Sequence, residues 1–210
     1  MMGADLPADR RMLRGIIFDL DGTLVDSGLD FEAIRRDMGL PSGALILETL
    51  ARTPAGDEKL QMLEVLRRHE LQAAHRAVLY EGVAEFLEWI DSRQLPRGIL
   101  TRNSRESTEI VLERLSLRFS CVLTREDAPP KPDPEGLLSI CRQWQLPPSD
   151  VLFCGDYLFD LQAGGRAGMH TILYAPQTVP DFAPLADLVL RDFREAPEMI
   201  GKRFTFGEWT

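Results

Sequence analysis

The chain is 210 residues long, which is enough for one full-sized domain and a small insertion. Hydrophobic residues make up 44% of it and charged residues 27%, a composition typical of a globular rather than a disordered protein. The formal net charge of −9 argues against nucleic acid or an anionic membrane as the main partner, because such polyanions are bound by clusters of Lys and Arg.

The N-terminal end contains no apolar segment of the kind that a secretion signal needs. Nowhere does an apolar run approach the ~20 residues of a membrane-spanning helix. The three cysteines, Cys121, Cys141 and Cys154, form no zinc or disulfide pattern and are expected to be free, buried thiols. The sequence therefore predicts a cytoplasmic protein with a loose N-terminal extension, and it leaves open whether residues 1–11 are ordered.

The first expected strand covers 14–19 and is followed by a region without any strand pattern. Between residues 27 and 79, apolar positions recur only at helical spacing, which predicts helices at 31–38, 44–52 and 57–78. We expect this region to be a small all-α cap, 27–79, inserted after the first strand.

From residue 80 onward, apolar runs of strand length alternate with helical patterns. This order indicates an α/β fold in which helices wrap a Rossmann-like parallel sheet, whose strands are buried on both faces. The core domain is expected to be discontinuous and to comprise 1–26 and 80–210. The expected strands of this region are 97–101, 119–124, 151–155, 170–174 and 188–190, and its expected helices are 83–93, 107–115, 134–144 and 159–167.

Two carboxylates, Asp19 and Asp21, stand where the first expected strand ends, and Gly22 follows them. An Asp-Gly pair alone more often forms a simple turn. Acidic side chains this close repel one another unless a cation or a proton lies between them, and ligands bind at the carboxyl edge of an open parallel sheet. With three further motifs in order behind it, this run favours a functional site.

Thr101-Arg102-Asn103-Ser104 lies where a strand gives way to a helix, so a hydroxyl and backbone N–H groups could hold an anion there. A helix cap is the ordinary alternative for such residues. Lys131, one of only three lysines, stands among four prolines that restrict its backbone and direct its ammonium to a fixed place. The alternative for this residue is a solvated loop lysine.

Asp156 and Asp160 follow the expected strand 151–155. Together with Asp19 they could complete a site for Mg²⁺, which prefers oxygen ligands and keeps several of its waters.

The four motifs, in this order and context, resemble those of the haloacid dehalogenase superfamily, in particular its phosphoglycolate-phosphatase-like branch with a small helical cap. The resemblance covers nearly the whole sheet domain. Two positions depart from the family pattern: Arg102 stands where Asn is frequent, with Asn103 next to it, and Tyr157 stands where Ser or Thr is frequent. Whether Arg102 or Asn103 takes the phosphate-binding role therefore stays open.

The resemblance implies a Mg²⁺-dependent phosphatase that hydrolyses a small phosphate monoester through an aspartyl-phosphate. Asp19 would be the nucleophile, and Asp21 would donate a proton to the leaving oxygen and then activate water. The implied catalytic residues are Asp19, Asp21 and Lys131, and the phosphate-binding residues are Thr101, Arg102, Asn103 and Lys131. The implied metal ligands are Asp19, Asp21 through its backbone carbonyl, Asp156, and Asp160, which would either bind the ion through a water or orient the other ligands.

Phosphoglycolate, a sugar phosphate or a nucleotide monophosphate would suit these motifs equally, so the partner is a small phosphorylated metabolite of unspecified identity. The sequence does not reveal which cap residues set specificity, nor the oligomeric state. A phosphomutase of the same superfamily is the nearest alternative, and a non-catalytic binding module on this fold is the other. A dehalogenase is disfavoured because halide removal needs no acid at Asp21, and a phosphonatase would depend on Lys59, the only lysine of the cap.

Overall fold

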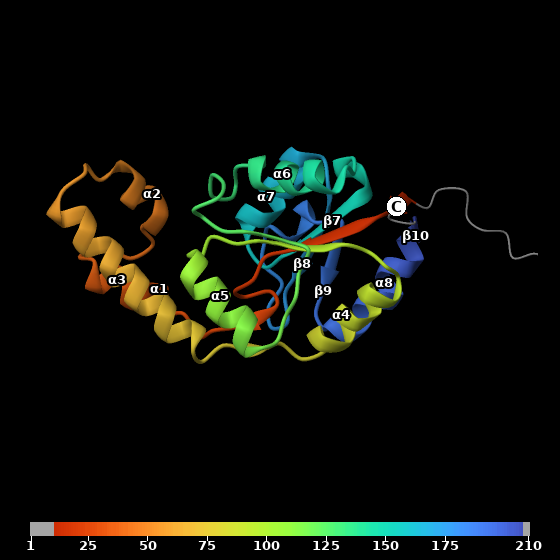
Figure 1. The fold of residues 1–210 in the computed structure, drawn as a ribbon, viewed down its shortest axis with the longest axis horizontal. Coiled ribbons are helices and arrows are strands. Elements are labelled where there is room, and N and C mark those ends of the chain that lie inside the picture. Colours follow the sequence, from red (N-terminus) through yellow and green to blue (C-terminus); the bar gives the residue numbers. More distant parts are fainter. Residues whose placement is uncertain (1–10, 208–210) are drawn as a thin grey trace, which may run out of the picture. The chain divides into compact units, whose positions relative to one another are not determined.

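The computed structural model describes residues 11–207 (Figure 1). Residues 1–10, which hold most of the expected N-terminal extension, and residues 208–210 lie outside the described part. The chain forms two compact units. The first runs to Val25 and continues through Leu79–Arg102 and from Phe119 onward, and the second comprises Asp26–Val78 and Asn103–Arg118. The division thus groups 103–118 with residues of the expected cap, and the domain boundaries given above stay a prediction.

The first unit is built on a six-stranded sheet in which all neighbouring strands are parallel. This confirms the expected α/β fold with a Rossmann-like sheet. The strands are mostly apolar, as expected for strands that helices cover on both faces, and β7 is buried along its whole length. In sheet order they are β6 (Cys121–Leu123), β5 (Arg97–Leu100), β2 (Gly15–Phe18), β7 (Val151–Gly155), β8 (His170–Tyr174) and β9 (Leu188–Leu190).

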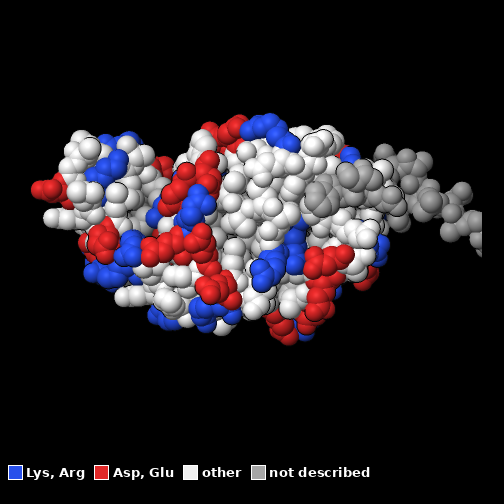
Figure 2. All heavy atoms as spheres, in the orientation of Figure 1, with Lys and Arg blue, Asp and Glu red and all other residues white. Residues whose placement is uncertain are grey.

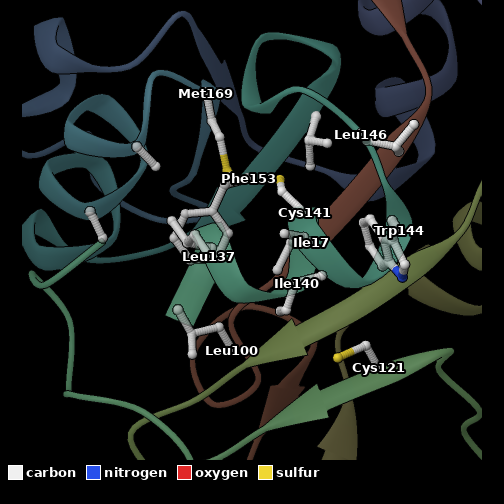
Figure 3. Packing of buried hydrophobic residues seen from close by; sticks show 13 residues of the cluster. Ile17, Leu100, Cys121, Leu137, Ile140, Cys141, Trp144, Leu146, Phe153 and Met169 are labelled. Atoms are coloured by element: carbon white, nitrogen blue, oxygen red, sulfur yellow. The ribbon is translucent and has the colours of Figure 1, made fainter. Parts of the chain in front are cut away.

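Figure 3 shows how part of this sheet is held against α6 (Glu135–Trp144) and α7 (Leu158–Ala167). Ile17 of β2 and Phe153 of β7 meet Leu137 and Ile140 of α6, and all four side chains are at most 1% exposed. This packing fixes the carboxyl ends of β2 and β7, which carry the first and fourth motifs.

The remaining elements of the first unit are short. They are α4 (Val83–Ser92), α8 (Ala196–Arg203), three 3₁₀ turns, and a parallel pair of β1 (Arg11–Leu13) with β10 (Phe204–Phe206). A second two-stranded pair joins β3 (Val25–Asp26) and β4 (Val78–Leu79).

The second unit contains α1 (Phe31–Asp37), α2 (Ile46–Arg52), α3 (Asp57–Ala74) and α5 (Arg105–Arg114). Its own core consists of Ile34, Ile46, Leu50, Met62 and Leu66. The three helices expected between residues 27 and 79 are all present. The third ends at Ala74 rather than at 78, because the chain becomes extended again to form β4.

Contacts between α3 and α5 explain why α5 belongs to this unit. Arg67 donates two hydrogen bonds to the carboxylate of Glu106, at 2.8 and 2.7 Å. Arg114 donates to the backbone carbonyls of Ala74 and Ala77 at the end of α3, both at 3.1 Å. These bonds also satisfy carbonyl groups that the end of a helix leaves without internal donors.

Figure 2 shows acidic and basic side chains intermingled on the face in view. Exposed ion pairs such as Arg194–Glu81 and Lys202–Glu198 are screened by water and salt and add little to stability. Within residues 11–207, no helix combines the length and the apolar character needed to cross a membrane.

Candidate active site

The carboxyl ends of β2 and β7 lie side by side. Phe18 of β2 is paired with Cys154 of β7, and the backbone N–H of Asp19 donates to the Cys154 carbonyl at 2.8 Å. Asp19 and Asp156 therefore leave the sheet at the same edge, as parallel strands require. With this register, acids that follow two separate strands lie close together, as the sequence predicts for Asp19 and Asp156.

Three carboxylates converge at this edge. Asp19, Asp156 and Asp160 each offer one oxygen, and these oxygens all lie within 4.8 Å of one another. Asp160 comes from the first turn of α7, where its Oδ2 accepts a hydrogen bond from the Tyr157 N–H at 2.9 Å. Gathering three acids at such distances is unfavourable unless positive charge or protons accompany them.

Lys131 supplies part of that positive charge. Its ammonium lies 2.7 Å from Oδ1 of Asp19 and 2.6 Å from Oδ1 of Asp160, and its side chain is only 2% exposed. A solvated loop lysine, the alternative for this residue, is therefore wrong. Burial by itself lowers the pKa of Lys131, but the charges and hydrogen bonds of Asp160 and Asp19 outweigh this and leave the pKa raised. The lysine stays charged and holds both carboxylates in place.

One lysine does not neutralise three acids. Burial raises the pKa of Asp19 to about 7; Lys131 opposes this rise and Asp160 adds to it. Burial also raises the pKa of Asp156 to about 8, with further contributions from the charges of Asp19 and Asp160. Without a further cation, these carboxyl groups therefore retain protons near neutral pH.

The turn that follows Asp19 is shaped around Asp156. Gly22 has a φ of +83°, a left-handed conformation that glycine adopts without strain. Its N–H donates to the Val25 carbonyl at 2.9 Å. Thr23, fully buried, donates its hydroxyl to Oδ1 of Asp156 at 3.2 Å. Asp21 lies in the same turn, partly exposed, and its backbone forms a bridge with Val25.

Thr23 was not among the residues predicted for the site. The only signal for it in the sequence is its place within the first motif, and the hydrogen bond to Asp156 depends on a contact across 133 residues of chain.

The boundary between the two units falls inside the second motif, between Arg102 and Asn103. Thr101 is buried at the end of β5, and its N–H donates to the Leu123 carbonyl at 3.0 Å. Because β5 pairs with β2, Thr101 and Asp19 follow neighbouring strands at the same edge. Arg102 donates to the backbone carbonyl of Lys131 at 2.6 Å, so it braces the loop that carries the lysine. Asn103 follows directly as the first residue of the second unit, and helix capping falls to Ser104, whose hydroxyl accepts from the Ser107 N–H at 3.3 Å.

The donor atoms suit a hard divalent cation. The three converging groups are carboxylates, and oxygen is the ligand that Mg²⁺ prefers; this set lacks the nitrogen and sulfur atoms typical of zinc sites. The surplus negative charge at the site is the second reason that a cation fits. Asp19, Asp156 and Asp160 are the side chains that would hold it.

Comparison with known proteins places this geometry in a family. A family model described as haloacid dehalogenase-like hydrolase matches residues 29–174, more than half of the chain. An N-acetylmuramic acid 6-phosphate phosphatase of Pseudomonas putida is 36% identical over 182 residues, which cover 76% of this chain and 81% of that protein. A phosphoglycolate phosphatase of Pseudomonas savastanoi pv. phaseolicola is 30% identical over 183 residues, covering 75% of this chain and 67% of that protein.

A solved structure shares the fold. The crystal structure of a hydrolase from Pseudomonas syringae superposes with a TM-score of 0.75 at 22% identity, covering 91% of this chain and all of that one. Because the family model and a relative at 36% identity both span most of the sequence, this chain belongs to the haloacid dehalogenase-like hydrolase family and is an enzyme of the hydrolase class.

Proposed function

We propose that the protein is a Mg²⁺-dependent phosphatase that hydrolyses a small phosphate monoester through a phosphoryl group carried on Asp19. The observation that carries the proposal is the convergence of three acids, two of which contact one buried lysine. Lys131 contacts Asp19 and Asp160, and an oxygen of Asp156 lies within 4.8 Å of an oxygen of each of these two acids. The names of two relatives, both phosphatases of small phosphorylated molecules, support it.

Mg²⁺ would be held by the carboxylates of Asp19, Asp156 and Asp160, with the backbone carbonyl of Asp21 as a further ligand. When bound, the ion supplies positive charge for the oxygens of the transferred phosphoryl group. Its presence also favours loss of the protons that the raised pKa values of Asp19 and Asp156 retain. Asp19 is a competent nucleophile only as the carboxylate, so ion binding and activation of the nucleophile are coupled.

In the first step, an oxygen of Asp19 attacks phosphorus in line, and the bond from phosphorus to the alcohol oxygen breaks. Asp21 gives its proton to that leaving oxygen. In the second step, Asp21 takes a proton from water, which attacks phosphorus and releases inorganic phosphate and the free Asp19 carboxylate. Lys131 and Thr101 would hold the transferred oxygens, with Arg102 or Asn103 beside them.

No single group suffices for this reaction. Enzymes accelerate phosphate-monoester hydrolysis by up to ~10²¹-fold. Most of this comes from positioning and from charge placed where negative charge develops. Lys131, which is 2% exposed and lies between the carboxylates of Asp19 and Asp160, provides such fixed charge without reorganisation of solvent.

The expected partner is a small phosphorylated metabolite rather than nucleic acid or a membrane, in a cytoplasmic setting; these remain predictions from the sequence.

The activity is tested by Mg²⁺-dependent release of phosphate from p-nitrophenyl phosphate. Asp19→Asn should abolish release, whereas Glu88→Gln, which changes an exposed carboxylate on α4 in the same way, should preserve it. Equal activity in Asp19→Asn and wild type would remove the proposed nucleophile.

A further inference from the structure

Three aromatic side chains cluster next to the acidic site. Tyr157 directly follows Asp156 in the chain and is 53% exposed. Its ring lies 5.2 Å from that of Phe159 and 6.1 Å from that of Phe182, at interplanar angles of 89° and 74°. We call Tyr157, Phe159 and Phe182 the aromatic ledge. Its two phenylalanines support the tyrosine nearly at right angles, so they hold the ring in place without stacking on it.

Arg102 ties the ledge to the reacting groups. Its guanidinium lies 5.1 Å from the centre of the Phe159 ring, within the range of a cation–π contact. The same guanidinium donates to the backbone carbonyl of Lys131, whose ammonium contacts Asp19. A continuous series of contacts therefore connects the ledge to the residue proposed to attack phosphorus.

The strand order puts the ledge across the site. Arg102 follows β5, and Phe182 lies in the segment between β8 and β9. Between β5 and β8 in the sheet stand only β2 and β7, the strands that carry Asp19 and Asp156. The ledge and its arginine thus span the same carboxyl edge from which the two acids project. The alcohol part of a phosphate ester attacked by Asp19 must leave from this edge.

An exposed aromatic ring beside the leaving alcohol favours ligands that can cover its face. A planar nucleobase, or the C–H face of a puckered sugar ring, gains dispersion contacts over a whole aromatic face. A two-carbon acid such as glycolate offers no face of that size. Stacking on aromatic rings is moreover tolerant of the polar groups around a ligand ring.

We propose that Tyr157 stacks on a ring in the leaving alcohol, so that the substrates are phosphate monoesters of ring-bearing alcohols rather than of short acyclic acids. The inference rests on the proposed phosphatase activity and adds the substrate class to it. Tyr157 then determines specificity without taking part in the bond changes. Phe159, Phe182 and Arg102 position it.

The test compares kcat/KM for three kinds of substrate: hexose 6-phosphates, nucleoside 5′-monophosphates, and the acyclic esters phosphoglycolate and glycerol phosphate. Wild type should prefer one of the two ring-bearing kinds, and which one it prefers identifies the ring. Tyr157→Ala should lower the ratio of kcat/KM for that kind over the acyclic esters by about tenfold. Tyr157→Phe keeps the ring and should keep the ratio. Since Tyr157 is exposed, both variants should fold, which thermal unfolding verifies.

Two failures are distinguishable. If wild type releases phosphate but prefers the acyclic esters, or if Tyr157→Ala leaves the ratio unchanged, the ledge does not select substrates and the inference is overturned while the phosphatase stands. If wild type with Mg²⁺ releases phosphate from none of the three kinds nor from p-nitrophenyl phosphate, the proposed activity itself is wrong and the inference falls with it.

Discussion

A Cβ atom added at Gly22 would lie 2.5 Å from Oδ2 of Asp156 and 2.7 Å from its Cγ. The turn after Asp19 and the acid at the end of β7 therefore fit together only if position 22 has no side chain. Because Gly22 also has a φ of +83°, any other residue would be strained there even without the contact.

Gly22→Ala is expected to displace the Asp156 carboxylate. Misplacing a reacting group by about 1 Å can cost ~100-fold in rate, so Mg²⁺-dependent kcat/KM should fall by about that factor. Gly43→Ala is the matched control, because Gly43 has a φ of +77° but nothing lies within 4 Å of an added Cβ. It carries the conformational strain without the clash. Similar losses of activity in the two variants would contradict the proposed role of the contact.

The raised carboxyl pKa values predict how the metal-free protein responds to pH. The pKa values of Asp19 and Asp156 rise from 3.8 to about 7 and about 8, so between these limits the folded state binds more protons than the unfolded chain. Stability therefore falls as pH rises through this window. Asp156→Asn removes one of the two titrations and should melt at a higher temperature than wild type at pH 8 without metal, with a smaller difference at pH 5.

With Mg²⁺ at pH 8, wild type should instead melt at a higher temperature than Asp156→Asn. The ion is expected to raise the melting temperature of wild type, more at pH 8 than at pH 6, because fewer protons have to leave at the higher pH. Asp156→Asn should gain little. A wild-type melting temperature that Mg²⁺ leaves unchanged at both pH values would mean that the three acids do not bind the ion.

Lys131→Met tests the buried ion pairs. The change leaves Asp19 and Asp160 without their shared cation, and breaking a buried pair costs about 3–5 kcal/mol of unfolding free energy. Activity should fall by about 10²–10³-fold, as for loss of one group that stabilises transition-state charge. Lys202→Met is the control, since Lys202 pairs with Glu198 at an exposed site. Denaturant unfolding and phosphate release measure the two effects, and equal stability losses in both variants would be inconsistent with a special role for Lys131.

Thr23→Val should weaken Mg²⁺ binding by about tenfold, because a hydrogen bond to a ligating carboxylate orients it toward the metal. The valine fills the same space but cannot donate to Asp156. That hydrogen bond lowers the pKa of Asp156, so its loss should raise the pKa further and weaken binding more at pH 7 than at pH 9. Thr23→Ser keeps the hydroxyl and should restore affinity. Calorimetric titration with Mg²⁺ at both pH values decides, and a loss equal in the valine and serine variants would point to packing instead.

The sheet was predictable from the sequence because its strands are covered on both faces. Such strands read as continuous apolar runs, and β7, β8 and β9 have the bounds expected for them. β1 (Arg-Met-Leu) and β10 (Phe-Thr-Phe) are not continuous apolar runs, and they pair with each other outside the main sheet, so the sequence pattern did not reveal them. The grouping of α5 with α3 was also illegible, since the Arg67–Glu106 pair joins positions 39 residues apart.

The site, too, could be predicted from the sequence only in part. Acids that follow two buried parallel strands must share an edge, which is why Asp19 and Asp156 could be expected to meet. The partners of Lys131 could be expected only in part: its contact with Asp160 depends on where α7 begins, and the proline-rich sequence around the lysine says nothing of that. Arg102 was expected to bind phosphate, and that role remains a prediction. The structure adds its contacts with the Lys131 carbonyl and the Phe159 ring.

The central claim is that Asp19 carries the phosphoryl group, and trapping that group tests it most directly. The enzyme is mixed with Mg²⁺ and substrate, quenched in acid during turnover, reduced with borohydride and digested for mass spectrometry. We expect reduction of an acyl phosphate to convert residue 19, and no other carboxylate, to homoserine, only when both substrate and Mg²⁺ are present. Turnover of phosphate ester without a reducible adduct at residue 19, or with one at another acid, would contradict the claim.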